Sequence, residues 1–392
     1  MLTPADPFQP LAGVRVVDFT RILAGPYATM LLAELGADVI KIERPGEGDD
    51  TRAWGPPFVD TNAAYFHAVN RGKRSVALDL ADPDDRATVD ALIASADVVI
   101  ENFRPGVTAR LGIDAATLAE SHPRLVHVSI TGFGTVGPMA EMPGTEVIVE
   151  AESGLMGITG HPGGEPVRFG VAMVDIATGL SAINGLLGAL LERERTGRGR
   201  QIEVSLYGTA LSSLGTVIAS EAAGGEAAKS RRWGSAHASI VPYCAFPASD
   251  GFLVLGATND GMWRRLCTAL ELGDAAANAA WATNAGRVAD RDAVEARIAE
   301  VTTPQTRAQV MERLQAHGVL VAPVLDVSDA ARSEQAQALG QVVAEGDHLF
   351  SRSPLAASGT AHLGRAPQLG EHNDDVLGEL AAHTKEEAAN AH

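Results

Sequence analysis

The first third of the chain alternates short, apolar, β-branched runs with longer segments of helical periodicity. The extended runs are VRVVDF at 14–19, DVIKIER at 38–44, DVVIENF at 97–103 and LVHVSITGF at 125–133. Such alternation is typical of βαβ units, in which parallel strands form a sheet covered by helices. The sequence therefore predicts an α/β protein whose larger domain has a Rossmann-like parallel sheet.

The rest of the chain indicates a second, smaller domain. An apolar segment at 169–191 is predicted to be a helix that ends at Gly197, and QIEVSLYGTAL after it is predicted to be a strand leading into another helix. From about Ser220 the composition becomes small and polar, which is typical of a linker. We expect a large domain at 1–220, a linker and small α/β domain at 221–325, and a C-terminal segment at 326–392 that returns to the large domain.

The apolar segment at 169–191 is long enough to raise the question of a membrane span. It carries a single charge, Asp175. A carboxylate in a lipid-exposed helix costs about 2.5 to 3.5 kcal/mol on insertion scales. The segment is therefore expected to be a core helix, not a membrane span.

Charge and cysteine usage exclude several classes of partner. The 392 residues have a formal net charge of -18, which repels nucleic acid and anionic membrane surfaces. The two cysteines form no CxxC motif, and no His and Cys cluster has metal-ligand spacing. No export signal is visible at the N-terminus. We expect a cytoplasmic protein without a bound metal.

Common nucleotide and hydrolase motifs are missing from the sequence. The first predicted strand runs into DFTRILAGP without a GxGxxG motif, and the chain has no GxxxxGK[ST], HExxH or GxSxG. The remaining candidate for a catalytic residue is Asp175, a single acid in an apolar segment. By position alone it is either a helix cap, a satisfied core carboxylate or a nucleophile.

Several ordered motifs resemble those of family III CoA-transferases over nearly the whole chain. The matching stretches are LAGVRVVDFTRILAGP, LGADVIKIERPGEGDDTR, YFHAVNRGKRSVALDL, ADVVIENFRPGVTARLG, VSITGFGTVGP, VDIATGL, RTGRGRQIEVSL and GRAPQLGEHNDDVL. The resemblance implies that Asp175 is the nucleophile and carries CoA as an aspartyl thioester. It also implies CoA as a substrate without a permanently bound cofactor, and an interlocked homodimer.

An acidic protein that binds CoA needs locally placed cations for the phosphates. The available basic side chains are Arg44, Lys73, Arg74 and Arg110. The resemblance implies that the CoA site is lined by Arg44, Leu78, Asn102, Phe103 and Arg110, and that Glu146 lies near the nucleophile. Leu23 stands where relatives carry Gln.

Two other functions stay open at this point. The same fold serves α-methylacyl-CoA racemases, which pair the aspartate with a histidine because proton transfer between two faces of a carbon needs two acid–base groups. Here the corresponding tripeptide is Gly144-Thr145-Glu146, without a histidine. A non-catalytic CoA-binding protein is the second alternative, and it would tolerate the loss of Asp175.

The segment RRWGSAHASIVPY at 231–243 bears on the substrate. It resembles the same segment of succinyl-CoA-dependent transferases that act on glutarate, hydroxymethylglutarate or itaconate. Arg232, Ser235 and His237 are therefore candidates to bind the distal carboxylate of a dicarboxylic acid, for which an Arg fork is well suited. Alternatively, the segment is a linker whose Arg and Trp side chains make interdomain contacts.

Overall fold

The computed structural model describes residues 7–224, 230–346 and 348–390, and the chain divides into two compact units. The first unit comprises Met1–Leu155, Arg168–Ala228 and Ser333–His392, and the second comprises Met156–Val167 and Lys229–Arg332. The sequence placed 156–167 in the large domain and 326–332 in the returning segment. Both of these stretches cluster with the second unit.

The first unit is built on a six-stranded parallel sheet, as the strand and helix alternation predicted. Its strands lie in the order β5 (Arg74–Ala77), β2 (Asp38–Glu43), β1 (Arg15–Asp18), β6 (Val98–Glu101), β7 (Val126–Thr131) and β8 (Gln201–Ser205). The chain adds strands on one side of β1 and then on the other, so the order reverses between β1 and β6. In open α/β sheets, ligands bind beyond the carboxyl ends of the strands at such a switch point.

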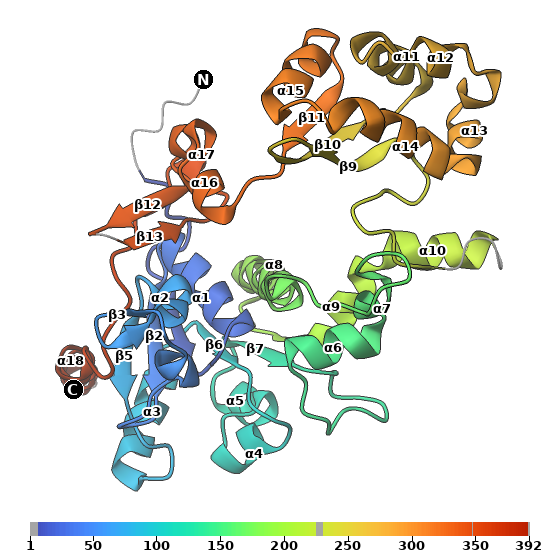
Figure 1. Cartoon of the computed structure of the whole chain (residues 1–392). Coiled ribbons are helices and arrows are strands. Elements are labelled where there is room, and N and C mark those ends of the chain that lie inside the picture. The colour runs from blue at the N-terminus through green and yellow to red at the C-terminus, as the bar shows by residue number, and fades with distance from the viewer. Residues whose placement is uncertain (1–6, 225–229, 347, 391–392) are drawn as a thin grey trace. The chain divides into compact units, whose positions relative to one another are not determined.

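Helices cover both faces of this sheet (Figure 1). On one face lie α1 (Ala24–Glu34) and α8 (Met173–Thr196), and on the other lie α3 (Pro83–Ala94) and α5 (Ala115–Ser121). Successive strand residues alternate between the faces. Apolar strand residues therefore pack against α3 and α5 in one buried cluster, which includes Val17, Ile40, Val76, Val99, Val89, Leu92 and Leu118.

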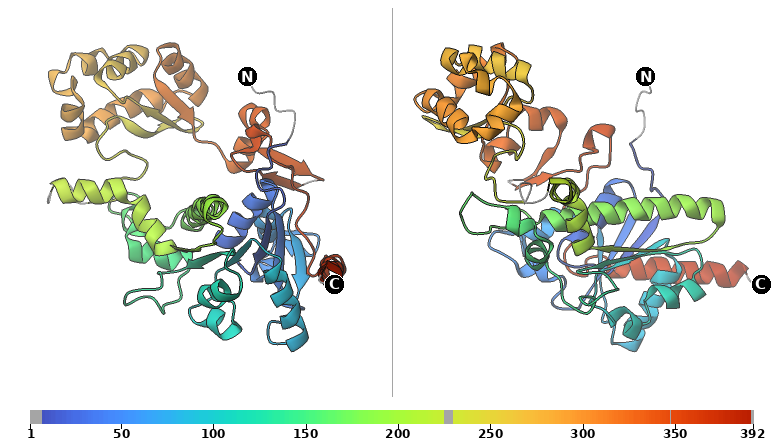
Figure 2. Two further views of the ribbon diagram at one scale, coloured as in Figure 1. Left: turned by 180° about the vertical axis from the view of Figure 1, so that it is seen from behind. Right: turned by 90° about the vertical axis from the view of Figure 1, so that its right-hand side faces the viewer.

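The long helix α8 lies along its face of the sheet next to α1 (Figure 2). The backbones of the two helices approach closely at Gly179, where an added Cβ would lie 2.6 Å from the Ala24 carbonyl oxygen. In the described part of the chain, α8 is the one helix long and apolar enough to cross a membrane. The core helices of globular proteins pass the same test, and α8 packs on α1, α9, β7 and β8.

The C-terminal segment packs against the edge of the sheet and is hydrogen-bonded to it. Helix α18 (Asn373–Asn390) packs on β5 and α3, and Asn373 Oδ1 accepts a hydrogen bond from the Ala77 N–H at 2.9 Å. Arg15 and Arg74 both pair with Glu379 of α18. Residues more than 290 positions apart thus form one unit.

The second unit has its own antiparallel sheet, in the order β11 (Leu320–Pro323), β10 (Gly251–Gly256) and β9 (Tyr243–Ala248). Helices α11 (Asp260–Ala269), α14 (Arg291–Thr302) and α15 (Arg307–Ala316) supply much of its core, which includes Trp263, Leu266, Ile298, Val310 and Leu314. The expected linker begins inside helix α10, and residues 225–229 of it lie outside the described residues.

The remaining elements are short. They are η1 (Asp50–Ala53), β3 (Phe58–Val59), β4 (Asn62–Ala63), α2 (Ala64–Asn70), α4 (Val107–Leu111), α6 (Glu146–Ser153), α7 (Leu155–Ile158), α9 (Leu206–Ser213), α10 (Gly215–Gly224), α12 (Gly273–Ala277), η3 (Ala279–Trp281), α13 (Asn284–Ala289), α16 (Val327–Ala331), α17 (Glu334–Leu339), β12 (Val342–Glu345), β13 (His348–Ser351) and η4 (Ala356–Ser358).

Candidate active site

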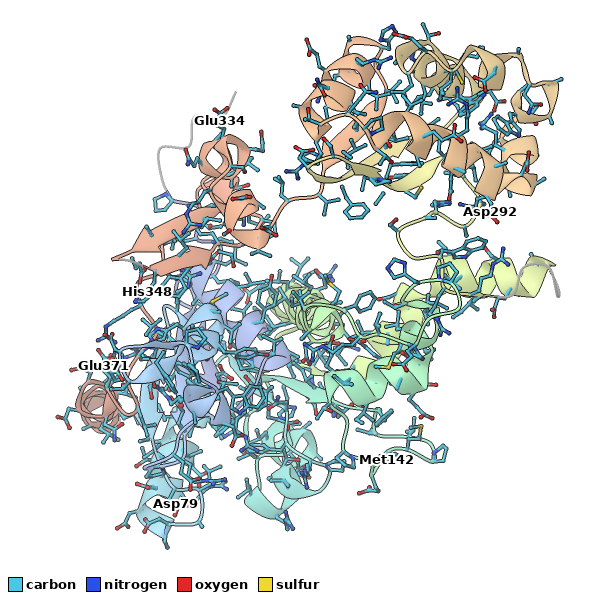
Figure 3. All side chains as sticks on the ribbon, viewed as in Figure 1. Asp79, Met142, Asp292, Glu334, His348 and Glu371 are labelled. Atoms are coloured by element: carbon cyan, nitrogen blue, oxygen red, sulfur yellow. The ribbon has the colours of Figure 1, made fainter. Side chains whose placement is uncertain are left out.

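A pocket of about 420 Å³ lies at the carboxyl ends of the strands, on both sides of the switch point. Its wall contains Phe19 after β1, Arg44 after β2, Leu78 after β5 and Phe103 after β6. Asp79, another lining residue (Figure 3), lies in the loop between β5 and α3, and its N–H donates to Asp85 of α3. The location and the mixed apolar and charged lining suit a nucleotide-containing ligand.

A buried ionic network holds the strand ends around this pocket. Lys73 Nζ donates to Asp18 Oδ2 at 3.1 Å, and Lys41 Nζ donates to Asp49 Oδ2 at 2.9 Å; all four side chains are fully buried. Burial alone would raise the pKa of Asp18, but the charges of Lys73 and Lys41 and hydrogen bonds from Thr20 and Thr29 outweigh it and lower that pKa to about 2. The Asp18 charge therefore depends on its partners.

The loop from β1 to α1 connects the pocket to α8. Asn102 accepts a hydrogen bond from the Arg21 N–H and donates one to the Arg21 carbonyl, at 2.9 and 2.8 Å. The next residue, Ile22, has a left-handed backbone (φ 73°), and its N–H donates to Asp49. Such strain in a β-branched residue persists only where its surroundings hold it.

The structure brings together only some of the residues expected to bind CoA. Arg44, Leu78 and Phe103 line the pocket. Asn102 does not line it and instead forms hydrogen bonds with the backbone of the β1–α1 loop. Arg110 is exposed on α4 and does not line the pocket either. Arg21 and Arg104 also line the pocket and were missed. Their positions just after predicted strands β1 and β6 were the available signal.

Lys73 and Arg74 are not at the pocket. Lys73 is buried, and its ammonium group is occupied by Asp18, Asn70 and the Pro26 carbonyl. Arg74 binds Asp38 at the amino end of β2 and Glu379 of α18. Neither residue lines the pocket, and both side chains have their partners within the first unit.

Asp175 lies in the first turn of α8, and a second carboxylate lies beside it. Glu146 in the first turn of α6 accepts hydrogen bonds from the Val174 N–H at 3.1 Å and from the Asp175 N–H at 2.8 Å. Glu146 is thus the cap for the free N–H groups at the start of α8. The Asp175 side chain does not cap its own helix and stays half-buried.

The electrostatic surroundings of Asp175 favour its protonated form. Burial, then the charge of Glu146 and a hydrogen bond with it, raise the pKa of Asp175 to about 7. Free N–H groups at a helix N-terminus would favour the ionised form of Asp175, but the N–H groups of Val174 and Asp175 are bound to Glu146. Burial followed by the charges of Asp175, Glu146 and Asp49 also raises the pKa of Tyr65 to about 12.

A close approach of two glycines places Glu146 next to α8. An added Cβ on Gly132, after β7, would lie 2.5 Å from the Gly144 Cα, so the loop returns directly across the end of the strand. Helix α6 begins two residues later at Glu146. This packing therefore requires glycine at both positions 132 and 144.

The three candidates for acceptor binding lie in the second unit and are engaged there. Arg232 Nη1 donates to the Gly157 carbonyl at 3.2 Å, and Ser235 Oγ accepts from the Ala245 N–H at 3.0 Å. His237 Nδ1 accepts from the Ser239 N–H at 3.1 Å, and its ring stacks on Tyr243.

Among residues 7–224, 230–346 and 348–390, no group of three His, Cys, Asp or Glu side chains could hold a metal ion.

Comparison with known proteins defines the class. The model of CoA-transferase family III matches residues 11–373. The chain belongs to this family, and it is an α/β CoA-transferase whose substrates are CoA thioesters.

The relatives include several transferases of dicarboxylic acids. The chain is 40% identical to the succinate–glutarate CoA-transferase of Agrobacterium fabrum, covering 95% of this chain and 96% of the relative. It is 40% identical to the succinyl-CoA:glutarate CoA-transferase of Mus musculus (96% and 87% covered) and 38% identical to the acetyl-CoA:oxalate CoA-transferase of Acetobacter aceti (97% and 98%).

Solved structures share the fold. A CaiB/BaiF family protein from Brucella suis matches with a TM-score of 0.86 and 40% identity, covering 95% of this chain and 99% of that chain. The Mycobacterium tuberculosis protein Rv3272 matches with a TM-score of 0.83 and 29% identity, covering 94% and 99%.

Replacing Lys73 by Met should destabilise the fold, because Asp18 would be left buried without its cation. We expect a loss of about 3 to 5 kcal/mol in the free energy of unfolding, measured by urea denaturation. The matched variant Arg44→Ala should change that free energy by less than about 0.5 kcal/mol and instead raise the KM for acyl-CoA. A stable Lys73→Met protein with a raised KM would show that Lys73 binds the ligand after all.

Asp175→Asn should stabilise the protein increasingly as the pH rises. The folded-state pKa lies above the unfolded value, so the wild type loses stability as the pH rises from about 4 to 7, while the Asn variant does not. Thermal or urea unfolding should show the difference growing over this range to about 3 to 5 kcal/mol and then staying constant. The exposed Asp292→Asn is the control. A difference independent of pH would contradict the raised pKa.

Proposed function

We propose that this protein transfers CoA from succinyl-CoA to a second dicarboxylic acid through a covalent intermediate on Asp175. The observation that carries the proposal is a half-buried carboxyl group held beside a second carboxylate at the start of α8, with its pKa raised to about 7. A carboxylate of raised pKa is a stronger nucleophile than an ordinary surface Asp, and yet it is substantially ionised at neutral pH.

The first half of the reaction loads CoA onto the enzyme. An Asp175 carboxylate oxygen attacks the thioester carbonyl of the donor and expels the CoA thiolate, which leaves a mixed anhydride. The thiolate then attacks the acyl carbon of Asp175 and releases the donor as a free carboxylate. The product is an aspartyl-CoA thioester, and no proton is gained or lost in the two steps.

The second half repeats these steps with the acceptor. The acceptor carboxylate attacks the aspartyl thioester and expels the thiolate, forming a second anhydride. Attack of the thiolate on the acceptor acyl carbon yields the new acyl-CoA and regenerates the Asp175 carboxylate. Water has to be kept away from both anhydrides, since hydrolysis would end the cycle.

The pocket is the proposed site for the nucleotide end of CoA. Arg21, Arg44 and Arg104 provide cations for the phosphates, and the tilted pair of Phe19 and Phe103, with ring centroids 6.3 Å apart, provides an apolar surface for the adenine or pantetheine. The β1–α1 loop contributes Phe19 and Arg21 to the pocket, and its end packs on Gly179 one turn after Asp175. This continuity supports one extended site within the first unit.

The dicarboxylate assignment is supported by the relatives, which include transferases named for glutarate, mesaconate and oxalate. We propose Arg232, with Ser235 and His237, as the site for the distal carboxylate of the acceptor. The guanidinium of Arg232 donates to the Gly157 carbonyl through Nη1, while its Nε is buried and has no hydrogen-bond partner among the described residues. A carboxylate would satisfy this group.

We also propose that the active protein is an interlocked homodimer in the cytoplasm. Large apolar side chains are exposed on α6 and α8, which is consistent with a covering partner; they are Val147, Ile148, Met173, Leu180 and Leu191.

Asp175→Asn and Asp175→Ala should both abolish transfer while the fold and CoA binding persist, since only the nucleophile is lost. Steady-state assay with succinyl-CoA and glutarate measures the activity, and calorimetric titration with CoA measures binding. Turnover by either variant, after deamidation of the Asn has been excluded, would overturn the covalent mechanism.

Asp175-dependent exchange of the α-proton of a 2-methylacyl-CoA in deuterated water would instead favour the racemase alternative.

A dicarboxylic acceptor should be used far better than a monocarboxylic acid of equal length, because the monoacid would leave a buried cation unpaired. Losing a charge-assisted hydrogen bond costs roughly 1.5 to 3 kcal/mol, so Arg232→Ala should lower kcat/KM for glutarate by about 10- to 150-fold. Arg231→Ala is the matched control, since Arg231 stacks on Trp233 at 4.0 Å. Equal use of glutarate and valerate, the five-carbon monoacid, or an equal loss for both in Arg232→Ala, would disprove this pocket.

A further inference from the structure

A third carboxyl group, Glu150, lies one helical turn after Glu146 on α6. Residues four apart lie on the same face of a helix, and both side chains are buried, Glu150 to 1% exposure. Glu150 Oε2 accepts a hydrogen bond from the Phe169 N–H at 3.2 Å. The two acids of α6 therefore bind the backbone at both ends of the segment 169–175 that carries the nucleophile.

The other oxygen of Glu150 is unusual. Oε1 is buried, and no donor among the described residues reaches it. A buried carboxylate oxygen without a donor is costly, and two adjacent buried carboxylates cannot both be ionised without a large penalty. A proton on Oε1 removes both problems, because the oxygen then becomes a hydrogen-bond donor toward Glu146.

We propose that Glu150 is a positioning residue that stays protonated and donates a hydrogen bond to Glu146, which holds the Glu146 carboxylate against the first turn of α8 beside Asp175. This inference rests on the proposed role of Asp175 as the nucleophile. Glu150 itself does not contact the reacting atoms; it acts through Glu146.

The electrostatics agree with this arrangement. The pKa of Glu150 is raised, mainly by burial and also by the hydrogen bond and charge of Glu146. The hydrogen bond from the Phe169 N–H and the charge of Arg168 act in the opposite direction but do not outweigh the rise. Tyr65 of α2 and Arg168 also act electrostatically on this group of acids, and Tyr207 lies on α9, which packs on α6. Tyr65 is influenced by Asp175 and Glu146, while the Tyr207 ring packs on Phe133.

The consequence is a defined effect on the pH dependence of transfer. A hydrogen bond from Glu150 stabilises the negative charge of Glu146. Without it the Glu146 carboxylate is a stronger hydrogen-bond acceptor for the Asp175 proton, so Asp175 holds that proton more tightly. The pH at which Asp175 becomes reactive should therefore rise.

The test compares Glu150→Gln with Glu150→Met, which have nearly the same shape. The amide of Gln accepts from the Phe169 N–H and donates to Glu146, so this variant should keep the wild-type acid limb of kcat/KM. Met can do neither. Its acid limb should move up by about one pH unit, so that kcat/KM falls about 5-fold at pH 7 and recovers near pH 9.

Two results would overturn the inference. One is an unshifted acid limb in Glu150→Met; the other is an equal loss in Glu150→Gln and Glu150→Met at every pH, which would mean that the ionised form of Glu150 is needed. If the Met variant fails to fold, infrared difference spectra of wild type against Glu150→Gln at neutral pH decide, since the wild type should show an extra protonated-carboxyl band. Asp175→Asn in the same assay separates the two proposals, because activity in that variant would refute the nucleophile and not Glu150 alone.

Discussion

The proposed chemistry depends on one contact, in which the carboxylate of Glu146 binds the free N–H groups at the start of α8. A helix N-terminus normally stabilises an acid in its own first turn. Here another acid has taken that position, so Asp175 gains a negative neighbour in place of the N–H donors and its pKa rises to about 7. The protein thereby keeps a carboxyl group that costs folding stability when it is ionised, as reactive sites commonly do.

The rest of the first unit maintains this arrangement. The close contact of Gly132 and Gly144 sets the path of the chain into α6, and Gly179 lets α8 approach the end of the β1–α1 loop. The loop is held in turn by Asn102 and by Asp49 of the buried ionic network. The pocket and the nucleophile are therefore parts of one connected structure, built on the carboxyl ends of the central strands.

The sheet was predictable from the sequence because parallel strands covered on both faces read as repeated β-branched runs between helices. Asp175 and Glu146 were identified by their surrounding motifs and not by periodicity, since a lone acid in an apolar helix has several explanations. Lys73 and Arg74, which were expected to bind CoA, do not line the pocket described here. Charge is visible in a sequence, but the partners that neutralise it, Asp18 for Lys73 and Glu379 for Arg74, lie 55 and 305 residues away.

The most direct test of the account is to trap the intermediate. The enzyme is mixed with succinyl-CoA in the absence of an acceptor, treated with hydroxylamine and digested, and the peptide containing residue 175 is analysed by mass spectrometry. We predict a hydroxamate on Asp175 that forms only when acyl-CoA has been added and is absent from the Asp175→Asn variant. An unmodified Asp175 during active turnover, or a modification on any other residue, would contradict the proposed mechanism.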